Sequence, residues 1–338
     1  MRNKYRAILF ILFVFFCYGL TCHASSLPRP KAKLTIKVID EETGLPIQNA
    51  IAGATFRIGG WDAEFTRVEG PTDKTGRYTV TGKGSRKITY GARHNDYYST
   101  GLEYNFNQIE SFTQLRHSPW NPELIVKLRK KKNPVPMIAL RVTAAVPELN
   151  KELGFDLIEA DWVAPCGKGK VSDFIFQVKK DFKSKDEYSG EMIVTFSNKF
   201  DGIYTYPVES NYPSELKLPH LAPDDGYERS LLKYERRVTK TGTNININKD
   251  QHYYFRIRSE EDEEGNLKRA MYGKIHGDIL LLNTFSIVKL DRNKPQLIRF
   301  DYYFNPDYTR NTEYKYKSNL YKKGVTKSKD LTVEMINN

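Results

Sequence analysis

The chain has 338 residues, with 53 Lys and Arg against 41 Asp and Glu and a formal net charge of +12. This length is enough for two domains with a sizeable core. The basic residues are dispersed except for Arg129–Lys132, so the charge indicates a solvated basic surface rather than a dedicated polyanion site.

Residues 1–24 are typical of a secretory signal peptide. Arg2, Lys4 and Arg6 precede the apolar run 7–20, and Ala24 supplies the small residue that cleavage needs. The run is short for a membrane crossing, and no later segment approaches the roughly 20 apolar residues of a transmembrane helix. We therefore expect a periplasmic or extracellular protein with no transmembrane segment in the mature chain, and no nucleic-acid partner.

The cysteines argue against a lipid anchor and against disulfides. Lipoprotein processing requires a small residue before the cysteine, but Phe16 precedes Cys17 and Thr21 precedes Cys22. Cleavage leaves Cys166 as the lone thiol, so core packing must hold the mature fold. With no histidine near it in sequence, Cys166 is expected to be a buried small hydrophobe rather than a nucleophile.

Residues 31–130 predict a small antiparallel β-sandwich. Alternation of apolar and polar residues indicates strands, which we place at 34–39, 50–58, 78–80, 87–92 and 124–128. Two turns connect them: Asp40–Gly44 and Asp73–Gly76 each begin with an aspartate and end with a glycine that tolerates positive φ.

The order of these elements resembles the carboxypeptidase regulatory-like domain. The matching pattern is D-x-x-T-G-x-P-I-x-x-A from Asp40 to Ala50, then T-D-x-x-G-x-Y from Thr72 to Tyr78. The resemblance implies a seven-stranded transthyretin-like β-sandwich, a spacer or accessory module of exported multidomain proteins, and it does not imply peptidase activity. One departure is the long segment Tyr98–Pro122, which is either an insertion covering a sheet edge, the reading that we favour, or a binding loop.

A basic, proline-containing linker is predicted at 131–136, followed by a larger β-rich domain of undetermined topology at 137–322. Strands are expected around 138–142, 173–178, 191–197 and 297–304, and a hairpin at 253–278 turns at Glu264–Asn266. Ser230–Val238 is expected to be a short helix, and 323–338 a polar C-terminal tail. This part resembles exported bacterial proteins that carry the same N-terminal module, which implies no activity.

The search for reaction chemistry predicts no catalytic, cofactor-binding or metal-ligating residue, and no cofactor. Zinc carboxypeptidase activity is not expected, because no H-E-x-x-H occurs and none of the five histidines considered is followed by Glu three residues on: His94, His117, His220, His252 and His276. The acidic run Glu260–Gly265 places Met271 where a calcium loop needs a carboxylate, so a solvated hairpin tip is expected. Loop Asp161–Lys170 holds two glycines and two lysines but is expected to be an ordinary glycine turn.

Two sets of residues remain open as functional candidates. Carboxylates for glycoside hydrolysis could not be ranked, since their spatial separation decides the chemistry; they are Asp161, Asp173, Asp224 and Asp301. Aromatic residues able to stack on sugars, but expected mostly in the core, include Trp61, Trp120, Trp162, Tyr204, Tyr206, Tyr302 and Tyr303.

The leading hypothesis is an exported, non-enzymatic binding or cell-envelope accessory protein that engages an envelope glycan or another envelope protein. The alternative is a hydrolase of unfamiliar type that acts on glycans. A cleft with two facing carboxylates beside exposed aromatic rings favours the hydrolase, whereas aromatic residues without such a pair favour binding.

Overall fold

A computed structural model describes residues 29–59, 63–109, 115–184, 186–207, 213–238, 242–248, 250–282, 295–328 and 330–336. The predicted signal peptide lies outside these residues. Contacts divide the chain into an N-terminal unit, Met1–Asn95 with Ser99–Leu128, and a C-terminal unit, Asp96–Tyr98 with Arg129–Asn338. Within the described ranges every regular element is a strand, which confirms the predicted mainly β class, and there is no helix long and apolar enough to cross a membrane.

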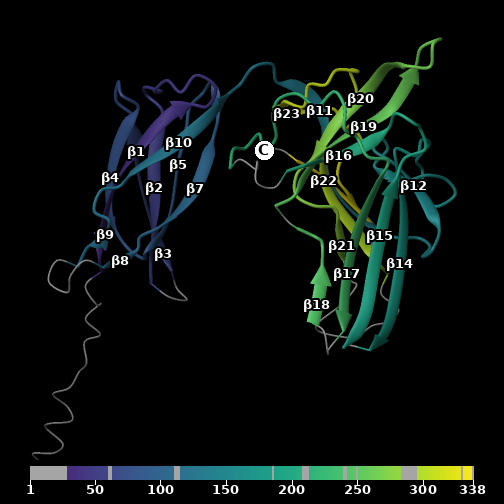
Figure 1. Cartoon of the computed structure of the whole chain (residues 1–338), viewed down its shortest axis with the longest axis horizontal. Coiled ribbons are helices and arrows are strands. Elements are labelled where there is room, and N and C mark those ends of the chain that lie inside the picture. The colour runs from purple at the N-terminus through teal and green to yellow at the C-terminus, as the bar shows by residue number, and fades with distance from the viewer. Residues whose placement is uncertain are drawn as a thin grey trace, which may run out of the picture. The chain divides into compact units, whose positions relative to one another are not determined.

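The N-terminal unit is built from two main sheets, whose strands lie in two layers in Figure 1. One sheet has the order β4-β1-β10 and the other β3-β2-β5-β7, with a separate pair β8-β9. The strands are β1 (Lys31–Asp40), β2 (Ile51–Ile58), β3 (Glu64–Pro71), β4 (Arg77–Lys83), β5 (Lys87–Arg93), β7 (Thr100–Asn105), β8 (Gln108–Ile109), β9 (His117–Ser118) and β10 (Glu123–Lys130).

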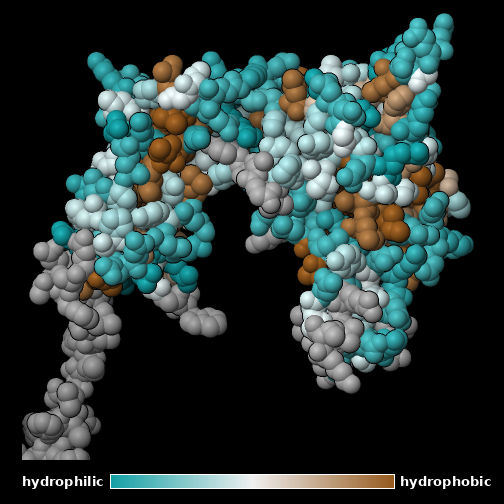
Figure 2. All heavy atoms as spheres, in the orientation of Figure 1, coloured by the Kyte–Doolittle hydropathy of each residue, from teal (hydrophilic) through white to brown (hydrophobic). Residues whose placement is uncertain are grey.

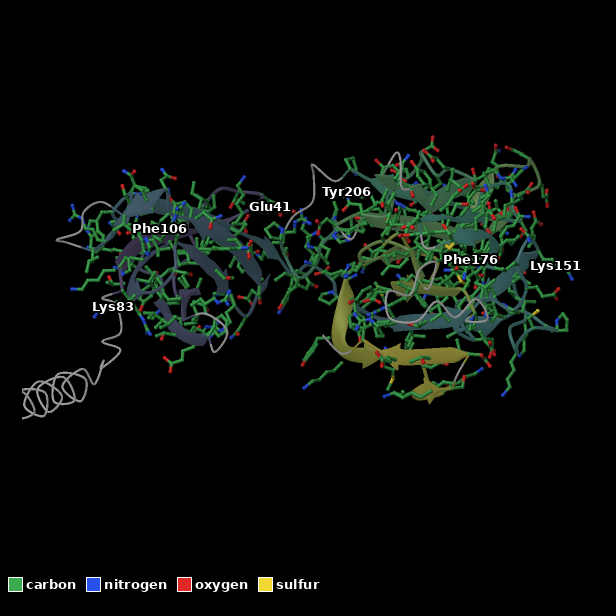
Figure 3. All side chains as sticks on the ribbon, turned by 90° about the horizontal axis from the view of Figure 1, so that it is seen from below. Glu41, Lys83, Phe106, Lys151, Phe176 and Tyr206 are labelled. Atoms are coloured by element: carbon green, nitrogen blue, oxygen red, sulfur yellow. The ribbon has the colours of Figure 1, made fainter. Side chains whose placement is uncertain are left out.

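The core of the N-terminal unit follows from the period-2 pattern. Every second residue of β1, from Ala32 to Val38, is fully buried. Phe56 of β2 is also fully buried, and a side chain at Gly82 of β4 would come within 2.4 Å of its ring. The two sheets therefore approach so closely at this point that only glycine fits. Phe106 lies within the same unit (Figure 3) and is fully buried.

Both predicted turns are confirmed. Asp40 Oδ1 accepts hydrogen bonds from the backbone of Glu42 and Thr43, and Gly44 takes a φ of +69°. Asp73 Oδ1 does the same for Thr75 and Arg77. The fully antiparallel pairing was wrong, however, because β1 and β10 pair in parallel.

Four strands of this unit were missed in the sequence: β3, β7 and the short pair β8 and β9. β3 is an edge strand with nearly every side chain at least partly exposed, so it lacks the alternation that marks a half-buried strand. β7 lies in the segment that we interpreted as an insertion, and it pairs with β5 at the edge of the same sheet. Part of the segment Tyr98–Pro122 is thus an integral strand.

The C-terminal unit contains a nine-stranded and a six-stranded sheet. The first has the order β16-β19-β20-β22-β11-β25-β24, with β21 on β22 and β23 on β11; the second has the order β13-β12-β14-β15-β17-β18. Their strands are β11 (Val135–Ala145), β12 (Glu152–Asp156), β13 (Asp161–Trp162), β14 (Phe174–Ser184), β15 (Glu187–Thr195), β16 (Gly202–Tyr206), β17 (Ser230–Val238), β18 (Gly242–Ile245), β19 (His252–Glu261), β20 (Leu267–Ile275), β21 (Leu280–Leu282), β22 (Leu297–Asn305), β23 (Tyr314–Asn319), β24 (Thr326–Lys327) and β25 (Leu331–Met335). β6 (Tyr97–Tyr98) pairs with the last two residues of β10.

Aromatic rings join these two sheets. Phe174 of β14 lies edge-on to Phe255 of β19 with ring centroids 5.3 Å apart, and Phe155 of β12 meets Phe300 of β22 at 5.7 Å. Phe176 belongs to the same buried cluster, and its place in the unit is labelled in Figure 3. The twofold alternation of the two strands places Phe174 and Phe176 of β14, and Phe300, Tyr302 and Phe304 of β22, in this core.

Three expectations for this unit were wrong. Ser230–Val238 is strand β17 between β15 and β18, because backbone pairing on both sides overrides the helix-like spacing of its apolar residues. The predicted tail contains β25, which pairs with β11 in the large sheet. β11 itself begins at Val135, inside the predicted linker. The predicted hairpin is confirmed as β19 and β20, closed by a bond from Asp262 N to Asn266 O.

Candidate binding pocket in the C-terminal unit

Each of the four carboxylates considered for hydrolysis interacts with a different group of the protein. Asp173 is buried and accepts two hydrogen bonds from the Arg258 guanidinium, at 2.7 and 2.8 Å. Asp301 forms a comparable forked pair with Arg141, in which Nη2 lies 2.6 Å from Oδ2. Both arrangements join neighbouring elements, and both hold the carboxylate in an ion pair.

The other two carboxylates also have partners within the protein. Asp224 pairs with Arg310 at 2.6 Å, and its side chain is 83% exposed. Asp161 accepts bonds from its own loop, from the backbone of Trp162 and Lys168. The glycine loop that follows is therefore closed by its own aspartate, as an ordinary turn is.

The remaining sequence candidates are mostly structural. Cys166 packs against the main core, as expected of a small hydrophobe, but it is partly rather than fully buried. Trp162 and Tyr302 are buried, and the Tyr302 hydroxyl donates to Leu157 O. Tyr204 and Tyr206 pack against a small core cluster, whereas Tyr303 lines a pocket. Trp61 lies outside the described residues.

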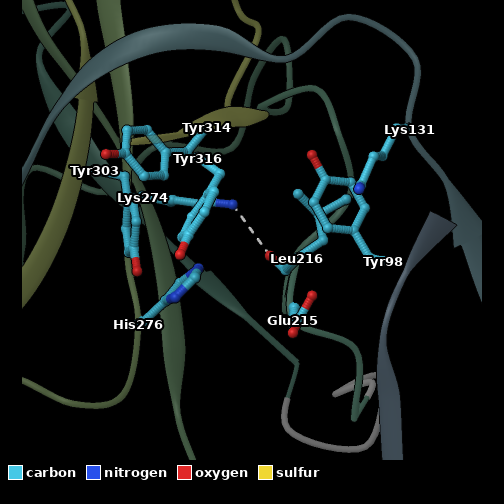
Figure 4. A pocket seen from close by; sticks show the side chains of 9 residues that line it. All are labelled: Tyr98, Lys131, Glu215, Leu216, Lys274, His276, Tyr303, Tyr314 and Tyr316. Atoms are coloured by element: carbon cyan, nitrogen blue, oxygen red, sulfur yellow. Dashed lines mark hydrogen bonds between the residues drawn. The ribbon is translucent and has the colours of Figure 1, made fainter. Parts of the chain in front are cut away.

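A tyrosine-rich pocket of about 360 Å³ lies within the C-terminal unit. Figure 4 shows the side chains that line it: Tyr98, Lys131, Glu215, Leu216, Lys274, His276, Tyr303, Tyr314 and Tyr316. β20 and its continuation provide Lys274 and His276, β22 and β23 provide three tyrosines, and the segment 215–216 closes one side. Its volume is in the range of small-molecule sites. We call it the tyrosine pocket.

Tyr316 is the exposed ring of the tyrosine pocket. Figure 2 shows hydrophilic residues over much of the visible face, with hydrophobic ones gathered in patches. Tyr316 is 56% exposed, and Lys317 Nζ lies 4.9 Å from the centre of its ring. Tyr303 and Tyr314 are 3% and 8% exposed, and their rings are tilted to one another with centroids 5.5 Å apart. The Tyr316 ring is thus available to a ligand, whereas the rings of Tyr303 and Tyr314 are buried.

Lys274 is the unusual polar group of the tyrosine pocket. It is 1% exposed, and its Nζ donates a hydrogen bond to Leu216 O at 3.0 Å, the dashed line in Figure 4. Burial lowers the pKa of this amine to about 7; the nearby Glu313 carboxylate opposes that change and Arg129 adds to it. The amine therefore titrates near neutral pH.

Two histidines lie beside this amine. The His276 ring packs on Tyr303 with centroids 4.4 Å apart, and its Nε2 is enclosed without a hydrogen-bond partner. Burial, followed by the charge of Lys274, holds the pKa of His276 well below its usual value. His252 accepts a bond from Gly277 N at Nδ1, and burial lowers its pKa to about 4. Both rings are neutral at physiological pH.

A buried carboxylate fixes one wall of the pocket. Glu313 is 1% exposed and accepts hydrogen bonds from the Tyr98 hydroxyl and from the backbone of Lys132 and Asn133. Burial, together with the Glu313 charge, raises the pKa of Tyr98, so its hydroxyl stays protonated and continues to donate. The carboxylate therefore ties the Tyr98 ring to the start of the C-terminal unit.

A hollow on the N-terminal unit differs from the tyrosine pocket in its lining. It is lined by polar residues that bond to one another: Arg77 pairs with Glu123 at 2.7 Å, and Thr35 bonds to both Thr79 and Asn121. Its hydrogen-bonding groups are thus engaged within the protein. Among the described residues, no cluster of His, Cys, Asp or Glu is suited to a metal ion.

The sequence search missed Lys274 and His276 as site residues, although a signal was present. Ala270, Tyr272 and Lys274 occupy alternate positions of one strand and are all buried. A lysine at an inward position of a predicted strand is unusual, because lysine is almost never fully buried without a partner. The convergence with Tyr98 and Tyr316, which are distant in sequence, had no sequence signal.

Comparisons with known proteins give no family. No protein-family model matches the chain, and no curated protein matches it. Among solved structures, one match is the crystal structure of BcpA, the major pilin subunit of Bacillus cereus. It has 12% sequence identity and a TM-score of 0.22, over 84% of this chain and 99% of that chain.

Proposed function

We propose that the protein is an exported, non-enzymatic glycan-binding protein of the cell envelope, and that the tyrosine pocket holds the sugar. The observation that carries this proposal is the convergence of four tyrosines, a buried amine and an unpartnered imidazole nitrogen on one pocket. Aromatic rings pack against sugar C–H faces, while a few fixed polar groups select hydroxyl and charge positions.

The sequence supplies the compartment in this proposal. A signal peptide at residues 1–24 directs export, and the resemblance to the carboxypeptidase regulatory-like domain assigns the N-terminal unit to an accessory module. The two-sheet architecture and the aspartate-glycine turns of that unit support this assignment. The binding chemistry then belongs to the C-terminal unit.

The Tyr316→Ala variant is expected to weaken glycan binding about three- to tenfold, because it removes the exposed stacking ring. The measurement is isothermal titration of the mature protein with oligosaccharides released from bacterial envelope polysaccharide. The control is Phe65→Ala, which removes a 68% exposed ring from the N-terminal unit. Equal affinity in all three proteins would place binding elsewhere, and release of reducing ends by the wild type would favour the hydrolase.

The predicted signal peptide leads to a second expected result. Secreted protein should begin at Ser25, with the mass of an unmodified chain, since cleavage follows Ala24 and neither Cys17 nor Cys22 fits lipoprotein processing. Intact-mass and N-terminal peptide spectrometry measure both properties. A first residue of Cys22 carrying a diacylglycerol mass would overturn the assignment of a lipid-free protein.

A further inference from the structure

We propose that the sugar bound in the tyrosine pocket is acidic, and that the carboxylate of a uronic acid residue binds the Lys274 amine. The inference rests on the proposed glycan-binding function and names the class of sugar. It starts from a comparison between two buried lysines of the same unit, one paired with a carboxylate and one hydrogen-bonded to a neutral carbonyl.

Lys233 and Lys274 are 5% and 1% exposed. Lys233 pairs with Asp278 at 2.9 Å, as a buried lysine normally requires. For Lys274, the hydrogen-bond acceptor within the described part of the chain is the neutral Leu216 carbonyl. An ammonium carries three N–H donors, so two are left for a ligand.

The surroundings of Lys274 favour an incoming carboxylate. The groups that act on its charge are Glu313, which favours the protonated form, and Arg129, which opposes it. Lys217 and Lys274 both disfavour protonation of His252 and His276, which marks the region as electropositive. The lining adds Lys131 and the exposed Glu215. A ligand carboxylate would thus meet a mostly positive wall.

His276 offers a hydrogen-bonding position for one ligand hydroxyl. Its Nε2 is enclosed and unpartnered, and either tautomer of the neutral ring leaves this atom needing a partner. An N–H at this position donates to a sugar oxygen, and a bare nitrogen accepts from a sugar hydroxyl. A uronic acid residue carries a carboxylate, hydroxyls and an apolar C–H face together, so one sugar satisfies Lys274, His276 and the tyrosines.

Binding of the carboxylate should be coupled to a proton. The amine titrates near neutral pH and must be protonated to pair with the ligand. Affinity is therefore expected to be constant at pH values well below 7 and to fall by up to about tenfold per pH unit above it. The heat of binding should depend on the buffer at pH 8, because the buffer supplies the proton.

The experiment uses isothermal titration of the mature protein with two probes: a glucuronate-containing tetrasaccharide and the same oligosaccharide with its carboxyl groups reduced to hydroxymethyl. At pH 6 the wild type is expected to bind the acidic probe at least about tenfold more tightly than the reduced one. Lys274→Met should abolish this preference. Lys268→Met, which removes an exposed lysine from the same strand, should retain it.

The outcomes separate the two proposals. Equal affinity of wild type for the acidic and reduced probes, with no proton uptake at pH 8, would overturn the uronic acid assignment and leave glycan binding intact. Failure of both probes and of the released envelope oligosaccharides to bind would overturn glycan binding itself. Proton uptake is measured on the wild type, so the test does not depend on the folding of a variant.

Discussion

Replacing Asp278 by asparagine is expected to lower the free energy of unfolding of the C-terminal unit by about 3–5 kcal/mol. The Asp278 side chain is fully buried and pairs with the nearly buried Lys233 at 2.9 Å. It also accepts hydrogen bonds from the Tyr253 hydroxyl at 2.7 Å and from Asn248 N at 2.7 Å. Asparagine keeps the shape but leaves the Lys233 charge without its counter-ion, and that uncompensated charge is the main cost.

Urea unfolding measures this loss. A Trp61→Phe, Trp120→Phe background leaves Trp162, a buried residue of the C-terminal unit, as the fluorescent reporter. The matched control is Asp224→Asn, because Asp224 is 83% exposed in its pair with Arg310 and exposed ion pairs contribute little. A loss below about 1 kcal/mol for Asp278→Asn would contradict the role of this pair in holding the strands together.

The Lys274→Met variant is expected to have a pH-dependent effect on stability. The amine has a pKa of about 7 in the folded chain against an ordinary value of 10.5. Between these pH values the unfolded chain binds a proton that the folded chain does not, so wild-type stability rises with pH across this window. Below it the folded protein carries a buried charge at a cost on the order of 3–5 kcal/mol.

Methionine removes the charge and its pH dependence, so Lys274→Met should gain most over the wild type near pH 6 and lose that advantage toward pH 10. The lost bond to Leu216 O lowers the stability of the variant by about 1 kcal/mol at every pH. The informative quantity is therefore how the difference in stability between variant and wild type changes with pH. Urea unfolding at pH 6, 7.5 and 9 measures it. Lys268→Met should show a flat difference, and an equally flat difference for Lys274→Met would contradict a buried amine of lowered pKa.

The Asp278→Asn and Lys274→Met variants together test the different roles of the two buried lysines. Asp278 neutralises Lys233, so that lysine is part of the scaffold. Lys274 faces a neutral carbonyl in a pocket and reduces stability when charged. A residue that lowers stability is retained most readily where it contributes to binding.

Strands with apolar residues at every second position could be predicted from the sequence. In β1, β11 and β22, apolar residues recur at every second position, and the structure buries those positions. The aspartate-glycine turns were equally clear, since Gly44 and Gly76 both take positive φ. These features depend on residues close together in the chain, which is why a sequence pattern reports them.

Elements defined by their neighbours were missed or misassigned. β3 is exposed on both faces and therefore shows no alternation. β17 carries Leu231, Leu232 and Tyr234 at spacings that also fit a helix, and only pairing with β15 decides for a strand. β25 does alternate Leu331, Val333 and Met335, but its short length and lysine-rich surroundings concealed it until β11 provided a partner.

The sequence by itself determined the mainly β class and two aspartate-glycine turns, because these depend on local composition and period. Only the tertiary structure decided the parallel pairing of β1 with β10 and the partners of each candidate carboxylate. It also brought Tyr98, Lys274 and Tyr316 to one pocket. Residues so far apart in sequence meet only through strand order and register, and burial beside an uncharged acceptor is what lowers the pKa of an ordinary lysine.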